Sequence, residues 1–138
     1  MILGLGIDSV EIERFEHWHT FLQSQLLKFF SKSETDYCLA VREKSAERFA
    51  ARFAAKEALL KALMHLQPVK PLLLLTVAKK SNLIVENNAT PKLKIDWPFF
   101  IENYFPMLKK EPETFISITH TKTIATVCII LTQKQLAC

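Results

Sequence analysis

The segment Glu47–Met64 constrains the fold most, because it predicts one long, buried helix. It contains no Gly, Pro or β-branched residue, and its commonest residue, alanine, is the best helix former. At about 100° per residue, one side of this helix carries the large apolar residues and most of the opposite side carries alanine. A helix that is apolar on nearly all sides is buried, so we expect it to be the central helix of the fold.

Three charged residues lie in unexpected places on this helix. Lys56 falls inside the large apolar stripe, Glu57 lies at its edge, and Lys61 follows one turn later on the same side. Burying an unpaired charge is costly, so such groups need a partner or a ligand. One interpretation is an i,i+4 pair between Glu57 and Lys61, worth roughly 0.2–0.5 kcal/mol. The other is a carboxylate held for a cation and a lysine held for an anion.

Composition bounds the class of protein. The 138 residues fit one domain, 1–138, and the 49% hydrophobic content argues against disorder. A net charge of +4 favours an acidic partner: nucleic acid, a phosphorylated metabolite or an acidic protein. No run of Lys and Arg is dense enough to single out nucleic acid, so a nucleic-acid-binding domain is a weak hypothesis.

Cysteines and apolar runs indicate the compartment. Cys38, Cys128 and Cys138 are scattered without zinc-ligand or redox spacing, which favours core filling in a reducing, cytoplasmic setting. The N-terminus lacks a basic segment and is not expected to be a signal peptide. The longest apolar run, Pro71–Ala78, is too short to span a membrane.

The N-terminal segment ends in a residue with two interpretations. Met1–Ile7 predicts a buried strand, and Gly4 and Gly6 on one face of it indicate close packing by another element. Asp8 follows. It is expected either to cap the next helix, with Glu11 completing a capping box, or to present a carboxylate to Mg²⁺. That ion prefers one or two carboxylates plus substrate phosphates.

The remaining patterns predict an α+β fold: a mixed or mainly antiparallel sheet around the central helix. Helices are expected at 11–30, at 33–41 with Ser33 as its cap, and at 97–108. Strands are expected at 72–79, 82–86 and 92–95, with a turn at 87–91, and at 114–118 and 124–131 as a terminal hairpin. The aromatic residues of 97–105 favour core or subunit contact over base stacking.

Two further residues leave alternatives open. Arg14 lies on the outer side of the first predicted helix, as a solvated charge or as part of a docking surface. His120 lies in the polar hairpin tip Ser117–Lys122, as a surface histidine or as a ligand contact. Spacing gives it no neighbouring histidine with which to bind a metal.

Three segments together resemble a known family. They are Gly6–Phe15 (GIDSVEIERF), Arg52–Ala62 (RFAAKEALLKA) and Ser117–Thr121 (SITHT). In order and spacing along the whole chain, they resemble the holo-[acyl-carrier-protein] synthases, the short form of the 4′-phosphopantetheinyl transferase superfamily. The second segment is the most specific of the three.

The resemblance implies an activity. Members of this family move the 4′-phosphopantetheine group of coenzyme A onto a serine of apo acyl carrier protein and release adenosine 3′,5′-bisphosphate, in support of fatty acid biosynthesis. It further implies a cytoplasmic homotrimer with sites at subunit interfaces. Such a transfer at a pyrophosphate depends on positioning and charge neutralisation.

The resemblance also implies roles for residues. Asp8 and Glu57 match the Mg²⁺ ligands, and Lys61 matches the lysine that neutralises the pyrophosphate. Glu57, directly or through a metal-bound water, is the candidate acceptor of the serine proton. The nucleotide of coenzyme A is expected near Arg52, Ser117 and His120, some of them from a neighbouring subunit. Arg14 matches a contact to the acidic helix of the carrier protein.

The chain departs from the family pattern in two loops. Leu63–Gln67 replaces a Gly-Thr-Gly loop, and Asn88–Pro91 replaces an Asn-Gly-Lys-Pro turn. Both changes remove glycines that allow close backbone approach to a ligand. A rival hypothesis is a non-catalytic module that keeps the fold and binds an acidic carrier protein. The retained Asp8, Glu57 and Lys61 argue against it, because a pure binder has no need of two carboxylates and a lysine around a phosphate.

Overall fold

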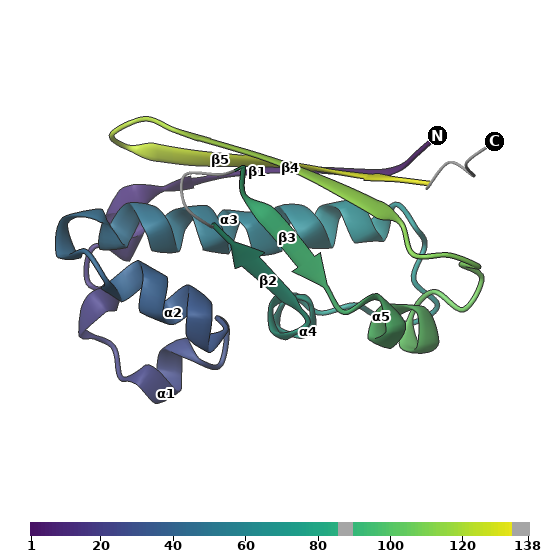
Figure 1. Cartoon of the computed structure of the whole chain (residues 1–138), viewed down its shortest axis with the longest axis horizontal. Coiled ribbons are helices and arrows are strands. Elements are labelled where there is room, and N and C mark those ends of the chain that lie inside the picture. Colours follow the sequence, from purple (N-terminus) through teal and green to yellow (C-terminus); the bar gives the residue numbers. More distant parts are fainter. Residues whose placement is uncertain (86–89, 134–138) are drawn as a thin grey trace.

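The structure is a computed structural model that describes residues 1–85 and 90–133 (Figure 1). The strands are β1 (Ile2–Glu11), β2 (Ser81–Ile84), β3 (Lys92–Ile95), β4 (Glu113–His120) and β5 (Ile124–Thr132). The α-helices are α1 (Gln23–Leu26), α2 (Lys32–Leu39), α3 (Ser45–Met64), α4 (Leu74–Lys79) and α5 (Trp97–Asn103). Three 3₁₀ turns are η1 (Ile12–Phe15), η2 (Trp18–Thr20) and η3 (Arg42–Lys44).

A three-stranded sheet and α3 form the centre of the fold. The sheet has the order β1-β5-β4, and both pairings are antiparallel. α3 runs along one face of this sheet, and β2 and β3 form a separate antiparallel ribbon that crosses α3 in this view (Figure 1). The expected α+β fold, with antiparallel strands and a long central helix, is confirmed. Among the described residues no helix combines the length and hydropathy needed to cross a bilayer.

β1 and α3 touch backbone to backbone. A Cβ built on Gly6 would overlap the carbonyl oxygen of Ala58, and it would lie 2.8 Å from the backbone nitrogen of Ala62. A Cβ on Gly4 would likewise overlap the carbonyl oxygen of Ala62. We call this the glycine–alanine contact (Gly4, Gly6, Ala58, Ala62). It explains both the two glycines and the alanine side of the helix.

Two predicted elements are wrong. The expected helix at 11–30 is instead the end of β1, two 3₁₀ turns and the single turn α1. β1 continues to Glu11 because that residue pairs with Ile124 of β5. Beyond it, aromatic packing sets the path of the chain, with the rings of Phe15 and Trp18 only 4.5 Å apart. Tertiary contacts have overridden the apolar periodicity here.

The expected strand at 72–79 is also wrong, because residues 74–79 form α4. A short apolar run does not distinguish a strand from a buried helix, and leucine is a good helix former. The helix predicted at 33–41 is α2, and its cap is Ser31 rather than Ser33: the Ser31 hydroxyl accepts from the Glu34 amide at 3.1 Å. The helix predicted at 97–108 ends at Asn103.

Other expectations are confirmed. Trp97, Phe100 and Phe105 are buried core residues, as expected for the aromatic stretch. The terminal hairpin exists, with strands slightly longer than predicted. The strand expected at 82–86 and the turn expected at 87–91 fall partly on residues 86–89, outside the described residues.

The cysteine prediction holds for one residue only. Cys38 is fully buried, and burial raises the pKa of its thiol to about 12, so it fills the core as an inert thiol. Cys128 is only half-buried in β5, so core filling is wrong for it. Cys138 lies outside the described residues.

Gly6→Ala should destabilise the protein by about 3 kcal/mol, because the added methyl group meets helix backbone that cannot move aside easily. Chemical denaturation measures the change. Ser9→Ala in the same strand is the control. Its exposed hydroxyl forms a side-chain hydrogen bond with Thr126 Oγ1, so the variant should lose about 1 kcal/mol or less of stability. Equal losses in the two variants would contradict the close glycine–alanine contact.

Candidate active site

Asp8 lies on β1 two residues beyond Gly6, on the face of the sheet that α3 covers. Its Oδ1 accepts a hydrogen bond from Lys61 Nζ at 3.1 Å, and its side chain is only 10% exposed. Its Oδ2 is buried without a hydrogen-bond partner in the described part of the chain. A buried carboxylate oxygen without a partner is costly, so this atom is poised for a ligand. The helix-capping interpretation of Asp8 is wrong, because β1 continues past it to Glu11.

Glu57 lies on α3 immediately before Ala58. Burial raises the pKa of its carboxyl group above the ordinary value, and the negative charge of Asp8 raises it further. The charges of Lys61 and Arg14 act in the opposite direction. The negative charge of Asp8 therefore lies within electrostatic range of Glu57 and disfavours the ionised form of the Glu57 carboxyl group.

Lys61 joins the helix to the strand. Its Nζ donates to Ile7 O at 3.0 Å as well as to Asp8, and the side chain is still 54% exposed. The expected i,i+4 pair of Lys61 with Glu57 is not formed, because the ammonium group turns to β1 instead. An exposed ammonium group next to two carboxylates leaves room for an anionic ligand.

These groups fit a divalent cation. Within residues 1–85 and 90–133, no group of three or more His, Cys, Asp or Glu side chains is placed to hold a metal, so a cation at this site would take at most the two carboxylates of Asp8 and Glu57 from the described residues. Two carboxylates, one with an unpartnered buried oxygen, match the donor set of Mg²⁺, which takes its other ligands from water and phosphates.

Arg52 does not join this cluster within one chain. Nine residues before Lys61 on the same helix, it points to the opposite side of α3. Its guanidinium lies 4.2 Å from the centre of the Tyr37 ring, and the residue is 3% exposed. It lines a cavity of about 250 Å³ together with Ser33, Tyr37, Leu83, Ile84 and Val85. Burial lowers its pKa, and its Nε has no partner in the described residues. Its role at a nucleotide stays a prediction.

Ser117 and His120 lie elsewhere again. The hairpin tip was placed too early, because β4 runs on to His120 and Ser117 is in the body of the strand. Ser117 is exposed on the face of the sheet that points away from α3, opposite Cys128. His120 Nε2 lies 3.0 Å from Glu47 Oε1, near the start of α3. Within one chain, Ser117 therefore lies on the other face of the sheet from the carboxylate of Asp8.

Arg14 is exposed on η1, as expected, although that segment is a 3₁₀ turn. Its guanidinium carbon lies 5.6 Å from the centre of the Phe53 ring. The sequence had no signal for Glu47 as the partner of His120. Glu34 could have been found, because Ser31-x-x-Glu34 is a capping-box pattern.

Comparison with known proteins gives the family. Residues 4–121 match the model of the 4′-phosphopantetheinyl transferase superfamily, so the chain belongs to that superfamily. Over 50 residues it is 46% identical to the holo-[acyl-carrier-protein] synthase of Treponema denticola, a match that covers 36% of this chain and 40% of that relative.

Solved structures share the fold. A holo-(acyl-carrier-protein) synthase from Bacillus anthracis, in complex with coenzyme A (3′,5′-ADP), has a TM-score of 0.71 at 23% identity over 97% of this chain and 99% of its own. A Chronobacterium ammoniagenes ACPS–CoA complex has a TM-score of 0.72 at 22% identity over 96% and 98%. At these identities the likeness establishes the fold.

Glu57→Gln should raise the melting temperature at neutral pH. A carboxyl group whose pKa is raised on folding binds its proton more tightly in the folded state, so the folded state loses stability as pH rises through that pKa. A neutral amide avoids both the burial of charge and the repulsion by Asp8. Calorimetry against wild type and the exposed control Glu13→Gln tests this. A lower melting temperature in Glu57→Gln alone would contradict the crowded carboxylate pair.

Proposed function

We propose that this chain transfers the 4′-phosphopantetheine group of coenzyme A to a serine of apo acyl carrier protein. The serine oxygen forms a bond to the pantetheine-bearing phosphorus, the bond from that phosphorus to the bridging oxygen breaks, and adenosine 3′,5′-bisphosphate leaves. The observation that carries the proposal is the cluster Asp8, Glu57 and Lys61, which combines a cation site with an exposed ammonium group in a chain of this superfamily.

Each residue has a task in this proposal. Asp8 and Glu57 would hold Mg²⁺, which supplies charge neutralisation on the pyrophosphate when bound. Lys61 orients and neutralises the phosphate oxygens with the part of its ammonium group that faces solvent. Glu57 is the carboxylate that accepts the serine proton. The 1–138 chain acts as one transferase domain.

The transfer assay uses the same glutamate. Glu57→Gln keeps the shape and removes the charge, so transfer at limiting Mg²⁺ should fall by about 10³-fold or more. The mass of the carrier protein, measured over time, reports the rate. Glu13→Gln is again the control and should transfer like wild type. Wild-type rates in Glu57→Gln would refute the site, while an inactive wild type would refute the function and favour a non-catalytic carrier-binding module.

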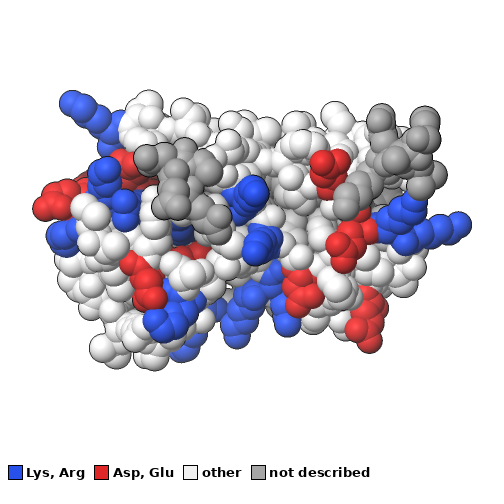
Figure 2. Space-filling view, in the orientation of Figure 1, with Lys and Arg blue, Asp and Glu red and all other residues white. Residues whose placement is uncertain are grey.

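Carrier docking is the second part of the proposal. Acyl carrier proteins are acidic, and this chain has a net charge of +4, so electrostatic steering favours their encounter. Arg14 is exposed beside Phe53, and its charge reaches Glu57. A carrier bound there would present its serine next to the carboxylates. On the face in Figure 2, basic side chains lie in separate groups with acidic ones between them, which suits a local contact better than a nucleic-acid track.

Arg14→Glu should raise KM for the carrier about tenfold and reduce its salt dependence, and leave KM for coenzyme A near the wild-type value. Steady-state kinetics at two salt concentrations measure both constants. Lys109→Glu makes the same charge change at an exposed position after α5 and should have a small effect. A change in the coenzyme A constant alone would assign Arg14 to the nucleotide instead.

We further propose that three copies assemble and share sites at their boundaries. Large apolar side chains are exposed on the outer face of the sheet, which α3 does not cover: Leu5 at 48%, Ile7 at 58% and Phe115 at 51%. Leu5 and Phe115 both pair with Ile130, so they form one continuous row. An exposed patch of this kind marks a protein–protein contact. Ser117 lies on the same face, so a neighbouring chain would bring it to the carboxylates of another copy.

Phe115→Glu should dissociate the assembly and abolish transfer while the helix content stays that of wild type, because a buried charge opposes the contact. Light scattering should report three chains for wild type and for Phe115→Leu, and one for Phe115→Glu. Provided that His120→Ala is inactive by itself, mixing it with Glu57→Gln should restore part of the activity, since some boundaries receive both intact halves. A fully active wild-type monomer would refute shared sites.

A further inference from the structure

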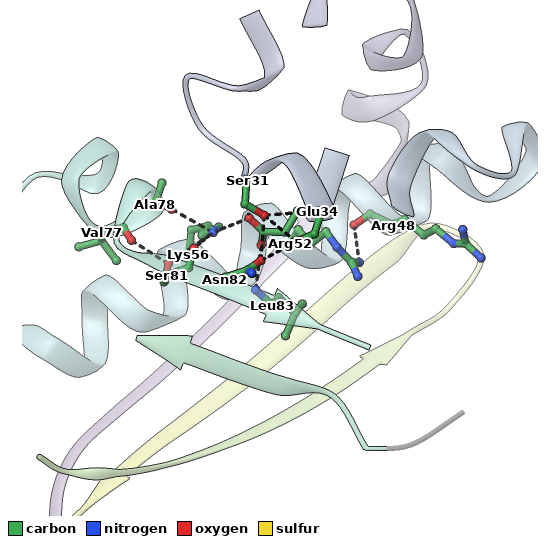
Figure 3. Close-up of polar contacts among 11 residues, drawn as sticks. Ser31, Glu34, Arg48, Arg52, Lys56, Val77, Ala78, Ser81, Asn82 and Leu83 are labelled. Atoms are coloured by element: carbon green, nitrogen blue, oxygen red, sulfur yellow. Dashed lines mark hydrogen bonds and ion pairs between the residues drawn. The ribbon is translucent and has the colours of Figure 1, made fainter. Parts of the chain in front are cut away.

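Lys56 is fully buried in α3, and its ammonium group is already saturated. Its Nζ donates to Glu34 Oε1 at 2.9 Å, to Ala78 O at 3.0 Å and to Ser81 O at 2.6 Å (Figure 3). An ammonium group has three protons, so these three oxygens use all of them. Lys56 therefore has no donor left for a phosphate, unlike the exposed Lys61.

Both carboxylate oxygens of Glu34 accept hydrogen bonds. Its Oε1 also accepts from the Ser31 amide at 2.9 Å, and its Oε2 accepts from the Leu83 amide at 3.0 Å (Figure 3). It is 1% exposed. The pair thus ties α3 to the start of α2, to the end of α4 and to β2. We call these residues the buried lysine cluster (Lys56, Glu34, Ala78, Ser81).

The cluster and the sheet hold α3 from nearly opposite sides. Taking Lys56 as zero on the helical wheel, Ala58 and Ala62 lie at about 200° and 240°, and these two residues touch β1. Glu57 and Lys61 lie between, at about 100° and 140°, and project toward Asp8. Lys56 and Glu57 are adjacent, so the atoms that bind Lys56 also fix the backbone that carries Glu57.

The alanine contact with β1 does not by itself fix the rotation of α3, although Phe49, Leu59 and Leu63 on its other sides are fully buried. Most of its contact surface toward β1 is alanine, which offers no large side chain to lock rotation or sliding. Hydrophobic contact is also non-directional. A buried ion pair is weak evidence for stability, because apolar replacements are often as stable. Three directional hydrogen bonds, however, fix the rotation of α3 about its axis and its position along that axis. The feature that needs such precision is the approach of Glu57 to Asp8.

We propose that Lys56 is a positioning residue: the buried lysine cluster sets the rotation of α3 that places Glu57 against Asp8, and Lys56 itself does not touch substrate. The inference rests on the proposed function for its kinetic readout. Its second readout, binding of Mn²⁺ to the free protein, does not depend on transfer.

Lys56→Met in the full chain is the first variant. It keeps the length of the side chain and removes the three donated hydrogen bonds. Glu34→Gln is the second variant, which breaks the cluster from the other end: the amide nitrogen would face the Leu83 amide, donor against donor. Phe100→Leu, a fully buried core change on α5 away from the site residues, is the control for lost stability. Circular dichroism sets the temperature at which all are folded.

Both cluster variants should lower kcat by about ten- to hundredfold, because small displacements of catalytic groups have effects of this size. They should also weaken Mn²⁺ binding, measured by electron paramagnetic resonance, and leave KM for the carrier near wild type. The control should retain both properties once folded. If one cluster variant does not fold, the test rests on the other variant. Cluster variants that match Phe100→Leu in kcat and in Mn²⁺ affinity would overturn the inference. A wild type that binds Mn²⁺ but transfers nothing would overturn the proposed function alone.

Discussion

The close contact between β1 and α3 is the constraint on which the rest of the structure depends. Because Gly4 and Gly6 have no side chains, the strand backbone lies directly on the carbonyl groups of Ala58 and Ala62. Asp8 follows Gly6 by two residues, and Glu57 precedes Ala58 by one. The contact that closes the core therefore also brings the two carboxylates together.

Two lysines of α3 lie in different surroundings because they point to different sides of the helix. Lys56 and Lys61 are five residues apart, about 140° around the helix. One is sealed among three oxygens, where burial lowers its pKa and the charge of Glu34 opposes that change. The other lies at the surface with Asp8 and stays open to solvent on one side. The same residue type is thus buried in hydrogen bonds on one side of the helix and exposed to solvent on the other.

Sequence patterns predicted the elements that depend on local composition. The alanine-rich helix was expected at 47–64 and begins only two residues earlier, and the hairpin of β4 and β5 was found from its β-rich segments. These patterns gave wrong predictions where contacts between residues distant in the sequence determine the local structure. Residues 12–22 follow an aromatic cluster instead of a helix, and the leucine run at 72–79 folds as α4 because its length suits either state.

The sequence likewise predicted one part of the candidate site and missed another. Motifs identified Asp8, Glu57 and Lys61, and the structure brings these three together. Pattern alone could not reveal that Lys61 pairs with Asp8 rather than with Glu57, because that choice depends on the path of β1. Nor could it place Ser117 on the outer face of the sheet. Helical spacing alone does put Arg52 on the far side of α3 from Lys61. We account for those two positions by proposing that they lie at the site of another copy of the chain.

The central claim is that the glycine–alanine contact assembles one cation and phosphate site from β1 and α3. Crystals of the protein with coenzyme A and Mn²⁺, measured for anomalous scattering, test it most directly. The account predicts a manganese peak between the carboxylates of Asp8 and Glu57, with the pyrophosphate beside Lys61 and the Ser117 of a neighbouring copy near the nucleotide. A peak away from both carboxylates, with coenzyme A bound elsewhere, would contradict it.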